Sequence, residues 1–443
     1  MPQKEPLVII IGGGPVGLTA AHALHHAGID FILLEQRSTV YNDDGASLVL
    51  GPASLRVMHQ LGILSTLMDI GAELDQRKSF TMDGFNFSDG SFYYIRRNHG
   101  SGPVAFHRAE LVQTLYQTLT DKSRNSILYN KKVTEIFSGD EGVRVRCTDD
   151  TTYTGTMLLG ADGVHSVTRH WMRKLALEFN KDLEWDAEEL FESTYRCLWC
   201  SFPRPTGPGY SSDTQHRDRS VMYITGRERG WIFLYEKLPQ PTKKRAYYTE
   251  SDILAVADRF ADFSIAEGLK VRDVFSRRIT SGMANLEEGA AKHWSWGRIV
   301  LAGDAVHKYT PNAGFGFQSG IQDVVSLCNH LQSAVSADQK DQMKTQDFAK
   351  VFEKYQQERS KGVVAEATAS ARATRSQAWM TTALFILARY IMPLRITNYI
   401  LFNWVVAKRA KDMLVLKYVD ADEPFTGSVQ WRHGLSTVSK GDR

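Results

Sequence analysis

Three glycines near the start of the chain have the spacing of a dinucleotide-binding turn. Gly12, Gly14 and Gly17 form the pattern G-x-G-x-x-G directly after the apolar run Leu7 to Ile11. In such a turn the first glycine allows a tight bend, the second lets a pyrophosphate approach the backbone, and the third lets the following helix pack closely. Glycine-rich turns are common, so the pattern needs support from its surroundings. It predicts a phosphate-bearing cofactor at the N-terminus of a helix.

An acidic residue follows at the place where such a turn needs one. Glu35 closes a second apolar run, Phe31 to Leu34, about twenty residues after the turn, where a carboxylate bonds ribose hydroxyls. The alternative is a surface glutamate at a strand end. The order of strand, turn, helix and strand favours the ribose role.

Two further glycine-containing motifs lie far downstream, each after a strand-like apolar run. Their candidate ligand residues are Asp162 with Gly163 in the first motif, and Asp304, Pro311, Gly314 and Gly316 in the second. The second motif opens a helix whose positive N-terminus favours negative charge. Taken alone, Asp162-Gly163 is also compatible with an ordinary turn.

The three motifs in this order resemble the group A, single-component FAD-dependent monooxygenases. The resemblance covers roughly residues 5 to 360. Within the family, the sequence is most similar to fungal epoxidases and hydroxylases of indole-diterpene and meroterpenoid pathways. Five features carry that narrower match: Gly45-Ala-Ser47, Phe106-His-Arg108, Thr194-Tyr-Arg-Cys197, the run from His307 to Asn312 and an apolar C-terminal tail. It implies FAD as cofactor and NADPH and O2 as co-substrates. One oxygen would pass from a C4a-hydroperoxyflavin to a lipophilic prenylated, terpenoid or indole substrate, as an epoxide or a hydroxyl group.

The resemblance also implies individual roles. Asp304 would meet the ribityl and pyrophosphate part of FAD, and Arg108 would lie along the pyrophosphate, which suits a forked guanidinium. Asp162 would serve both flavin and nicotinamide. Backbone N–H groups at Gly314 and Gly316, beside Pro311, would approach the flavin pyrimidine edge. The chain departs from the family pattern here, with Phe315, Phe317 and Gln318 in this loop.

A polar turn ahead of the helix expected at Pro52 to Leu61 lies near the flavin ring in the relatives. It contains Asp43, Gly45 and Ala46. We expect Gly45 and Ala46 to contact the cofactor and Asp43 to serve the reaction. The alternative is a solvated loop.

Period-two apolar spacing from Arg196 to about Gly282 predicts an antiparallel sheet with one face over a substrate pocket. Trp231, Phe233 and Tyr235 would share a face of one strand. Arg196 stands among apolar neighbours, where a guanidinium needs a partner or a function. The resemblance implies a catalytic role facing flavin and substrate, whereas the alternative is an arginine that points outward.

These elements predict an α/β (α+β) fold. A Rossmann-like FAD-binding domain would comprise residues 1–180 and 286–365, with an inserted antiparallel-sheet substrate domain at 181–285 and a helical apolar region at 366–443. Only one dinucleotide fingerprint is present, so NADPH would bind in a groove without a Rossmann domain of its own.

Residues 377–407 are the most apolar part of the chain. Arg389 and Arg395 divide them into two uncharged stretches, 376–388 and 396–407. Each stretch is shorter than the roughly 20 residues that span a bilayer. We therefore expect two helices broken near Pro393 that lie in one leaflet, with membrane contact through 377–411. The alternatives are packing on the protein's own core and a dimer interface.

Composition limits the other functions. Lys plus Arg total 53 against 50 Asp plus Glu, so no nucleic-acid partner is expected. Cys197 and Cys200 form a C-x-x-C without the residues that complete a metal site, so we expect a strand with two thiols and no metal.

The scarcity of cysteine and the early Gly12 predict an intracellular protein, cytoplasmic or on the cytosolic face of an internal membrane. A prenyl reductase and a non-catalytic flavoprotein remain alternatives, whereas the W-x-W-x-I-P pattern of flavin halogenases is absent.

Overall fold

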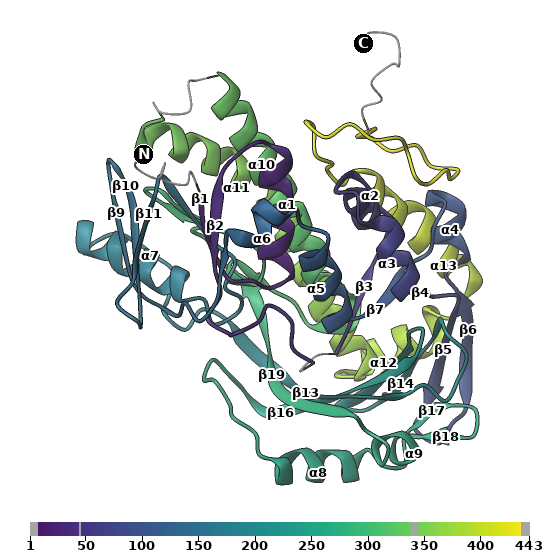
Figure 1. The fold of residues 1–443 in the computed structure, drawn as a ribbon. Helices are drawn as coiled ribbons and strands as arrows, with labels where there is room; N and C mark the ends of the chain where they lie inside the picture. Colours follow the sequence, from purple (N-terminus) through teal and green to yellow (C-terminus); the bar gives the residue numbers. More distant parts are fainter. Residues whose placement is uncertain (1–7, 44–45, 338–342, 436–443) are drawn as a thin grey trace.

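The computed structural model describes residues 8–43, 46–337 and 343–435. A dinucleotide-binding domain lies beside a large mixed sheet, and a helical C-terminal region runs along both (Figure 1). Sheets with parallel and antiparallel strands alternate with helices along the chain. The α/β fold class predicted from the sequence is confirmed.

The centre of the dinucleotide-binding domain is a six-stranded sheet. Its order is β20 (Ser295–Trp296), β21 (Ile299–Leu301), β12 (Met157–Gly160), β1 (Val8–Ile11), β2 (Phe31–Leu34) and β8 (Ile127–Leu128). All neighbours are parallel except β20 and β21. Because other layers cover both faces, the inner strands are continuous apolar runs. Every residue of β1 is buried.

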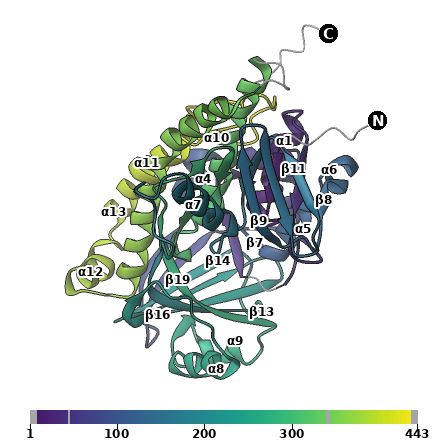
Figure 2. The same ribbon diagram turned by 90° about the vertical axis from the view of Figure 1, so that its left-hand side faces the viewer.

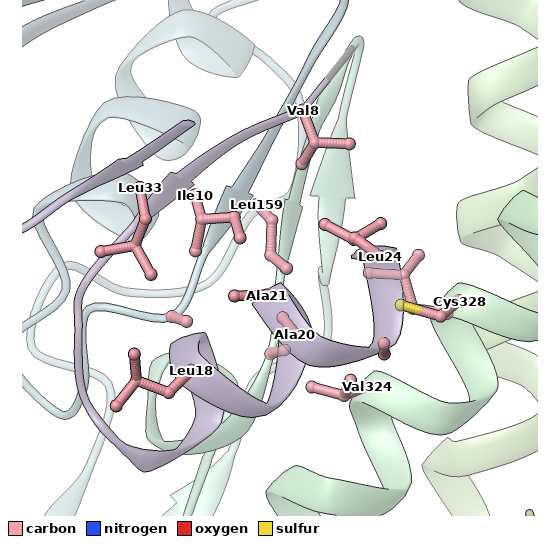
Figure 3. Packing of buried hydrophobic residues seen from close by; sticks show 14 of the residues in the cluster. Val8, Ile10, Leu18, Ala20, Ala21, Leu24, Leu33, Leu159, Val324 and Cys328 are labelled. Carbon is pink, nitrogen blue, oxygen red and sulfur yellow. The ribbon is translucent and has the colours of Figure 1, made fainter. Parts of the chain in front are cut away.

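Helix α1 (Pro15–His26) packs between this sheet and α10 (Gly316–Ala337). Ala20 and Ala21 let α1 approach the strands, and Leu24 belongs to the same core as Val324 and Cys328 of α10 (Figure 3). The opposite face of the sheet meets a three-stranded antiparallel sheet of β9 (Val133–Gly139), β10 (Gly142–Cys147) and β11 (Thr152–Gly155), and also α7 (Val167–Phe179).

The second large element is an eight-stranded sheet. Its order is β22 (His307–Lys308), β19 (Thr280–Ala290), β13 (Glu192–Pro203), β16 (Arg229–Thr242), β15 (Arg219–Thr225), β14 (Tyr210–His216), β5 (Gln76–Thr81) and β6 (Asn86–Ser91). Its pairings are antiparallel except that of β14 with β5. Strands β5 and β6 come from before residue 180. The sheet therefore reaches beyond the predicted segment 181–285, and those boundaries stay a prediction.

The two faces of this sheet are covered differently. Helices α8 (Glu250–Arg259) and α9 (Val271–Phe275), with the small hairpin β17 (Ser264–Ala266) and β18 (Leu269–Lys270), cover the outer face. Figures 1 and 2 show α8 and α9 on the side away from the dinucleotide-binding domain. The inner face, with Tyr195, Trp231 and Tyr235, is directed toward that domain.

Short elements connect the two sheets. Strands β3 (Ser47–Leu50), β7 (Val104–His107) and β4 (Ala72–Glu73) form a small antiparallel sheet. The helices near it are α2 (Pro52–Gln60), α3 (Leu64–Ile70), α4 (Tyr93–His99) and α5 (Arg108–Gln117), whereas α6 (Asp121–Asn125) lies beside α1 and β8. Two 3-10 turns, η1 (Gly303–Ala305) and η2 (Pro311–Ala313), precede α10.

The C-terminal region begins with the long helix α11 (Thr345–Gln377). It continues through α12 (Thr382–Ile386), η3 (Leu387–Ile391), α13 (Arg395–Ile400), η4 (Leu401–Val406) and α14 (Ala407–Lys411). The helical break at 392–394 agrees with the break expected near Pro393. Residues 412–435 return to the dinucleotide-binding domain, where Gln60 of α2 donates to the carbonyls of Leu416 and Val419.

Candidate active site

The first glycine turn follows β1 and leads directly into α1. Gly12 has a φ of +105°, and a Cβ there would lie 2.6 Å from the carbonyl oxygen of Ala161. A Cβ on Gly17 would lie 1.9 Å from the carbonyl oxygen of Gly12. A Cβ on Gly14 would meet no atom of the described residues within 4 Å. The turn is therefore packed on its inner side and open at Gly14, as a pyrophosphate-binding turn requires.

Glu35 lies at the end of β2, next to this turn. Its Oε2 accepts a hydrogen bond from the N–H of Gly13 at 2.6 Å, and its Oε1 accepts from the N–H of Arg37 at 2.9 Å. Each oxygen keeps a lone pair with which it can accept a ribose hydroxyl. The pocket above the turn is lined by Gly13, Gly14, Glu35, Arg37, Tyr41 and Arg108. The structure thus brings Glu35 and Arg108 to the turn, while the ribose bond itself stays a prediction.

Asp162 follows β12, whose turn packs beneath Gly12. Its Oδ1 accepts from the Ser166 hydroxyl at 2.5 Å, and its Oδ2 accepts from the N–H and the hydroxyl of Thr168, each at 2.9 Å. Burial raises the pKa of Asp162, although these hydrogen bonds oppose the rise. The carboxylate therefore fixes the start of α7, and its predicted contact with flavin and nicotinamide stays a prediction.

Asp304 lies in the turn after β21 and pairs with Lys308. Its Oδ2 accepts from Lys308 Nζ at 2.6 Å. Burial by itself raises the pKa of Asp304, but Lys308, His307 and Arg108 outweigh it and hold the pKa below its usual value. Arg108 therefore lies within electrostatic reach of Asp304, as the predicted shared site requires.

The loop from Pro311 to Gly316 connects this turn to α10. Gly314 has a φ of +64°, and a Cβ there would lie 4.0 Å from Val49 of β3. Gln318 holds the loop, because its Nε2 donates to the Gly314 carbonyl at 2.8 Å and its Oε1 accepts from the N–H of Gly51 at 3.0 Å. Gln318, which departs from the family pattern, therefore holds the loop in place. The sequence did not predict this role.

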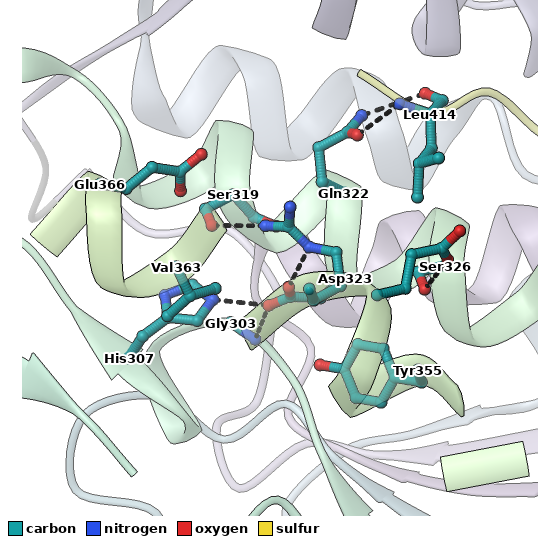
Figure 4. Close-up of polar contacts among 12 residues, drawn as sticks. Gly303, His307, Ser319, Gln322, Asp323, Ser326, Tyr355, Val363, Glu366 and Leu414 are labelled. Atoms are coloured by element: carbon teal, nitrogen blue, oxygen red, sulfur yellow. Dashed lines mark hydrogen bonds and ion pairs between the residues drawn. The ribbon is translucent and has the colours of Figure 1, made fainter. Parts of the chain in front are cut away.

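A buried charge network supports the Gly303 turn from behind (Figure 4). Asp323 of α10 accepts from the N–H of Gly303 at 3.0 Å, bonds His307 Nε2 at 2.6 Å and accepts from Arg359 Nε at 2.9 Å. Burial alone raises the pKa of Asp323, but the attraction of His307 and Arg359 outweighs it and lowers the pKa. The network fixes the turn that carries Asp304.

Asp43 lies where the chain passes from the dinucleotide-binding domain to the large sheet. Its carboxylate bonds His107 Nε2 at 2.8 Å and Arg229 of β16 at 2.8 Å. The carbonyl of Ala46 accepts from the N–H of Arg108 at 3.3 Å. Asp43 and Ala46 therefore join the two parts of the site, and Gly45 lies outside the described residues. The catalytic role expected for Asp43 stays a prediction.

The inner face of the large sheet presents large aromatic side chains beside Ala46. Tyr195, Trp231 and Tyr235 are fully buried, and the ring of Phe233 stacks against Tyr235 at 6.5 Å. The hydroxyls of both tyrosines and the indole N–H of Trp231 make no hydrogen bond within the described part of the chain. Burial also raises the pKa of Tyr195 to about 12, so its hydroxyl stays protonated. The inner face is therefore a packed aromatic cluster with a few polar atoms that have no partner among the described residues.

Comparison with known proteins identifies the family to which the chain belongs. A family model described as an FAD binding domain matches residues 5–367. The FAD-dependent monooxygenase dpmaE of Metarhizium anisopliae is 32% identical over 407 residues, which are 89% of this chain and 84% of that protein. The chain is an FAD-dependent monooxygenase. The FAD-dependent monooxygenase ausM of Penicillium brasilianum is 30% identical over 401 residues, which are 88% of this chain and 83% of that protein.

Solved structures share the fold of the monooxygenase. Klebsiella pneumoniae HpxO, solved with FAD and uric acid, superposes with a TM-score of 0.72 at 22% identity over 90% of this chain and 97% of its own. The tetracycline destructase Tet(51) superposes with a TM-score of 0.66 at 17% identity over 90% of this chain and 98% of its own. The predicted family, cofactor and reaction class are confirmed, and the alternative of a prenyl reductase finds no support.

The residues of the monooxygenase fit FAD. The open side of Gly14 and the N-terminus of α1 suit a pyrophosphate, and Arg108 adds the positive charge that the phosphates need. The N–H of Gly314 donates to the Pro311 carbonyl at 2.9 Å, so the expectation that it approaches the flavin is wrong. The backbone N–H groups suited to the flavin end are those of the first turn of α10, which begins at Gly316. The first and third motifs are therefore suited to the two ends of one cofactor site, and their individual contacts with FAD stay a prediction.

The expectation that Arg196 faces the flavin is wrong. Arg196 donates to Glu236 Oε2 at 2.8 Å, Glu236 also binds Arg259 of α8, and the guanidinium lies 5.9 Å from the Tyr248 ring. All these groups lie on the outer, helix-covered face of the sheet. Side chains alternate along a strand, so the inner face belongs to Tyr195 and the following odd-numbered positions. Arg196 therefore ties α8 to the sheet of the monooxygenase.

The C-x-x-C pattern lies on β13, as expected for a strand with two thiols. Cys197 packs on the inner face with Tyr195, whereas Cys200 packs on the outer face with Leu198. Burial raises the pKa of Cys200 to about 12. Within the described residues, no group of three or more His, Cys, Asp or Glu side chains could hold a metal ion.

Sequence reasoning missed the partners of Asp43. His107 adjoins Arg108 in the motif Phe106-His-Arg108, so its proximity to the cofactor could have been inferred from that neighbour. Arg229 gave no such signal, because it is 186 residues from Asp43 along the chain.

Proposed function

We propose that this monooxygenase uses NADPH and O2 to insert one oxygen atom into a lipophilic natural product that carries a prenyl alkene or an electron-rich aromatic or indole ring. The observation that carries the substrate class is the inner face of the large sheet, where Trp231, Phe233 and Tyr235 form an apolar aromatic wall. These side chains pack in one buried cluster beside Ala46, and their aromatic character favours an apolar substrate skeleton at this edge of the sheet. The hydroxyls of Tyr195 and Tyr235 have no hydrogen-bond partner among the described residues, which favours a substrate with one or two oxygen functions.

Bound FAD supplies the redox chemistry and the activation of O2. The chain's own residues position the reactants and exclude water. Asp43 holds His107 and Arg229 together, so the turn that contains Ala46 stays against the aromatic wall. The positive N-termini of α1 and α10 favour negative charge on the two ends of the cofactor.

A polar pocket is the candidate site for NADPH as the reductant. It has a volume of about 330 Å3 and lies against α7. Its lining includes Arg169, Arg173, His165, His170, His293 and Trp185, together with the carboxylates of Asp186 and Glu188. The pKa of His165 is lowered, first by burial and then by the positive charge of Arg245, Lys308 and Arg169. The rings of Trp185 and His293 stack at 4.0 Å, which offers a flat surface to a nucleotide base. We expect His170→Ala to raise the KM for NADPH and to leave the bound FAD spectrum unchanged.

The proposal is tested with purified protein reconstituted with FAD. A panel of prenylated phenols, indole diterpenes and terpenoids is incubated with NADPH under labelled O2, and products are analysed by mass spectrometry. We expect substrate-stimulated NADPH oxidation and one labelled oxygen atom in the product, and the product structure then distinguishes epoxidation from hydroxylation. NADPH oxidation that yields only hydrogen peroxide with every substrate of the panel would contradict the substrate class.

A further inference from the structure

We propose that the bent helix pair near the C-terminus docks the protein onto an anionic lipid surface without crossing it. The pair comprises Thr382–Ile391 and Arg395–Lys411, and its exposed apolar face is called the tail surface below. Ile386, Tyr390, Leu394, Ile396, Ile400 and Trp404 belong to it. Trp404 is 69% exposed and Ile396 is 62% exposed. This inference goes beyond the proposed function and does not depend on the flavin chemistry.

The geometry of the pair favours a position in the interface over a span. In the described ranges, no single helix is both long and apolar enough to cross a membrane, and the two helices reach that size only together, with a bend of 91° between them. Seventeen residues from Arg395 to Lys411 rise about 25 Å, which is less than the roughly 30 Å of a hydrocarbon core. Two helices at a right angle, whose apolar side chains share one exposed face, can lie within one leaflet of a bilayer.

The charges of this segment favour anionic lipid over a second copy of the chain. Residues 377–411 contain five cations and no Asp or Glu. Arg409 is directed inward, where it binds Glu366, and Arg389 lies over the rings of Phe85 and Phe87. Arg395 and Lys408 are exposed. Two copies meeting at this surface would bring like charges together, whereas lipid phosphates and carboxylates would neutralise them.

The tail surface is preorganised by contacts behind it. Tyr94 of α4 packs against Tyr399 at 5.8 Å, and Asn403 accepts hydrogen bonds from Arg97 at 3.0 Å and Asn98 at 2.9 Å. Phe402 is buried on this inner side. Because the helices are held in place, their apolar side chains remain directed away from the protein, and docking needs little further ordering.

Two residues outside the helix pair extend the surface. Tyr93 of α4 and Phe85 of the β5–β6 turn are each 57% exposed. Tyr93 packs beside Tyr94, and Phe85 lies under the guanidinium of Arg389. Aromatic rings at the edge of an apolar patch are typical of the depth of lipid headgroups. The surface therefore has an apolar centre, an aromatic edge and exposed cations, which together match a bilayer interface.

The first test measures co-sedimentation of the full-length FAD-bound protein with lipid vesicles. We expect binding to vesicles of phosphatidylcholine with phosphatidylserine, weaker binding to phosphatidylcholine alone, and a loss of affinity as salt rises. Trp404→Asp and Ile396→Asp should each lower the partition coefficient at least tenfold. Phe179→Asp is the matched control, because Phe179 is 80% exposed on α7, and it should bind as the wild type does. The FAD spectrum reports whether each variant is folded.

Charge variants and a measurement on unaltered protein complete the test. Arg395→Gln and Lys408→Gln should each weaken binding to the anionic vesicles by about fivefold and should not change binding to neutral ones. Brominated lipid should quench tryptophan fluorescence of the wild-type protein. The proposal is overturned if neither vesicle type binds the wild type, if Trp404→Asp binds equally well, or if the wild type forms a dimer that Trp404→Asp abolishes.

Discussion

At the scale of single residues, Arg108 is placed to set the affinity for FAD. It lines the pocket over the first glycine turn and lowers the pKa of Asp304 in the third motif. A hydrogen bond to a charged group contributes about 1.5–3 kcal/mol, so Arg108→Leu should weaken FAD binding by about tenfold to a hundredfold. Flavin fluorescence titration of the apoprotein measures this. Arg124→Leu, on the surface at α6, is the control, and equal affinities for both variants would argue against the assignment.

Asp323 gives a prediction about stability. Removing one partner of a buried ion pair costs about 3 kcal/mol or more, so Asp323→Asn should lower the free energy of unfolding by that amount near neutral pH. Urea unfolding measures the difference. Asp121→Asn, which removes an exposed pair with Arg124, should leave the stability unchanged.

The same carboxylate predicts a pH dependence. The pKa of Asp323 is lowered in the folded state from its ordinary value of 3.8. Its stabilisation is therefore complete above that value and is lost as the pH falls through the lower, folded-state pKa. Thermal unfolding of the wild type should show this loss on the acid side. A wild type and an Asp323→Asn variant with parallel acid-side curves would contradict it.

Sequence reasoning placed Gly12, Gly14 and Glu35 at one turn because strand, turn, helix and strand follow one another locally, and the structure brings them together there. Their contacts with the cofactor stay predictions. Arg196 was misplaced because a period-two pattern identifies a strand without identifying which of its faces meets the site. The pairing of Asp43 with Arg229 could not be predicted, since it depends on how two distant segments pack.

At the scale of elements, two glycines of the first turn have different roles. Gly17 is needed for the turn to fold, whereas Gly14 leaves room for the cofactor. A Cβ on Gly17 would overlap the Gly12 carbonyl, whereas a Cβ on Gly14 would meet no described atom within 4 Å. Gly17→Ala should therefore lower the thermal unfolding temperature of the apoprotein. Gly14→Ala should leave that temperature unchanged and weaken FAD binding, because the methyl group stands where the pyrophosphate approaches. Equal losses of apoprotein stability in both variants would contradict this division.

At the scale of the whole molecule, the returning C-terminal segment closes the dinucleotide-binding domain. Arg56 of α2 is fully buried and donates to both carboxylate oxygens of Glu423. Glu423→Gln would leave that guanidinium without its counter-charge, and we expect a loss of about 3 kcal/mol in the free energy of unfolding. The neighbouring Asp422 forms an exposed pair with His59, so Asp422→Asn is a matched control that should unfold like the wild type. Urea titrations of the two variants measure the difference.

The sequence predicted the order of the domains along the chain better than it predicted which strands belong to each sheet. The parallel sheet, the antiparallel strands of the middle segment and the broken apolar helices are all present, while the domain boundaries stay a prediction. The entry of β5 and β6 into the large sheet was missed, because residues 76–91 precede the middle segment by about a hundred residues. Strand pairing between distant segments leaves no local pattern that could reveal it.

The strand order of the parallel sheet has a consequence for biosynthesis. β1 lies between β2 and β12, and the other edge of β12 is covered by β21 at residues 299–301. During translation, β1 and β12 leave the ribosome long before β21 does. An apolar strand with an uncovered edge can pair with other chains. Completion of the parallel sheet is therefore a late event on the ribosome, and until then one edge of β12 is open to pairing with other strands.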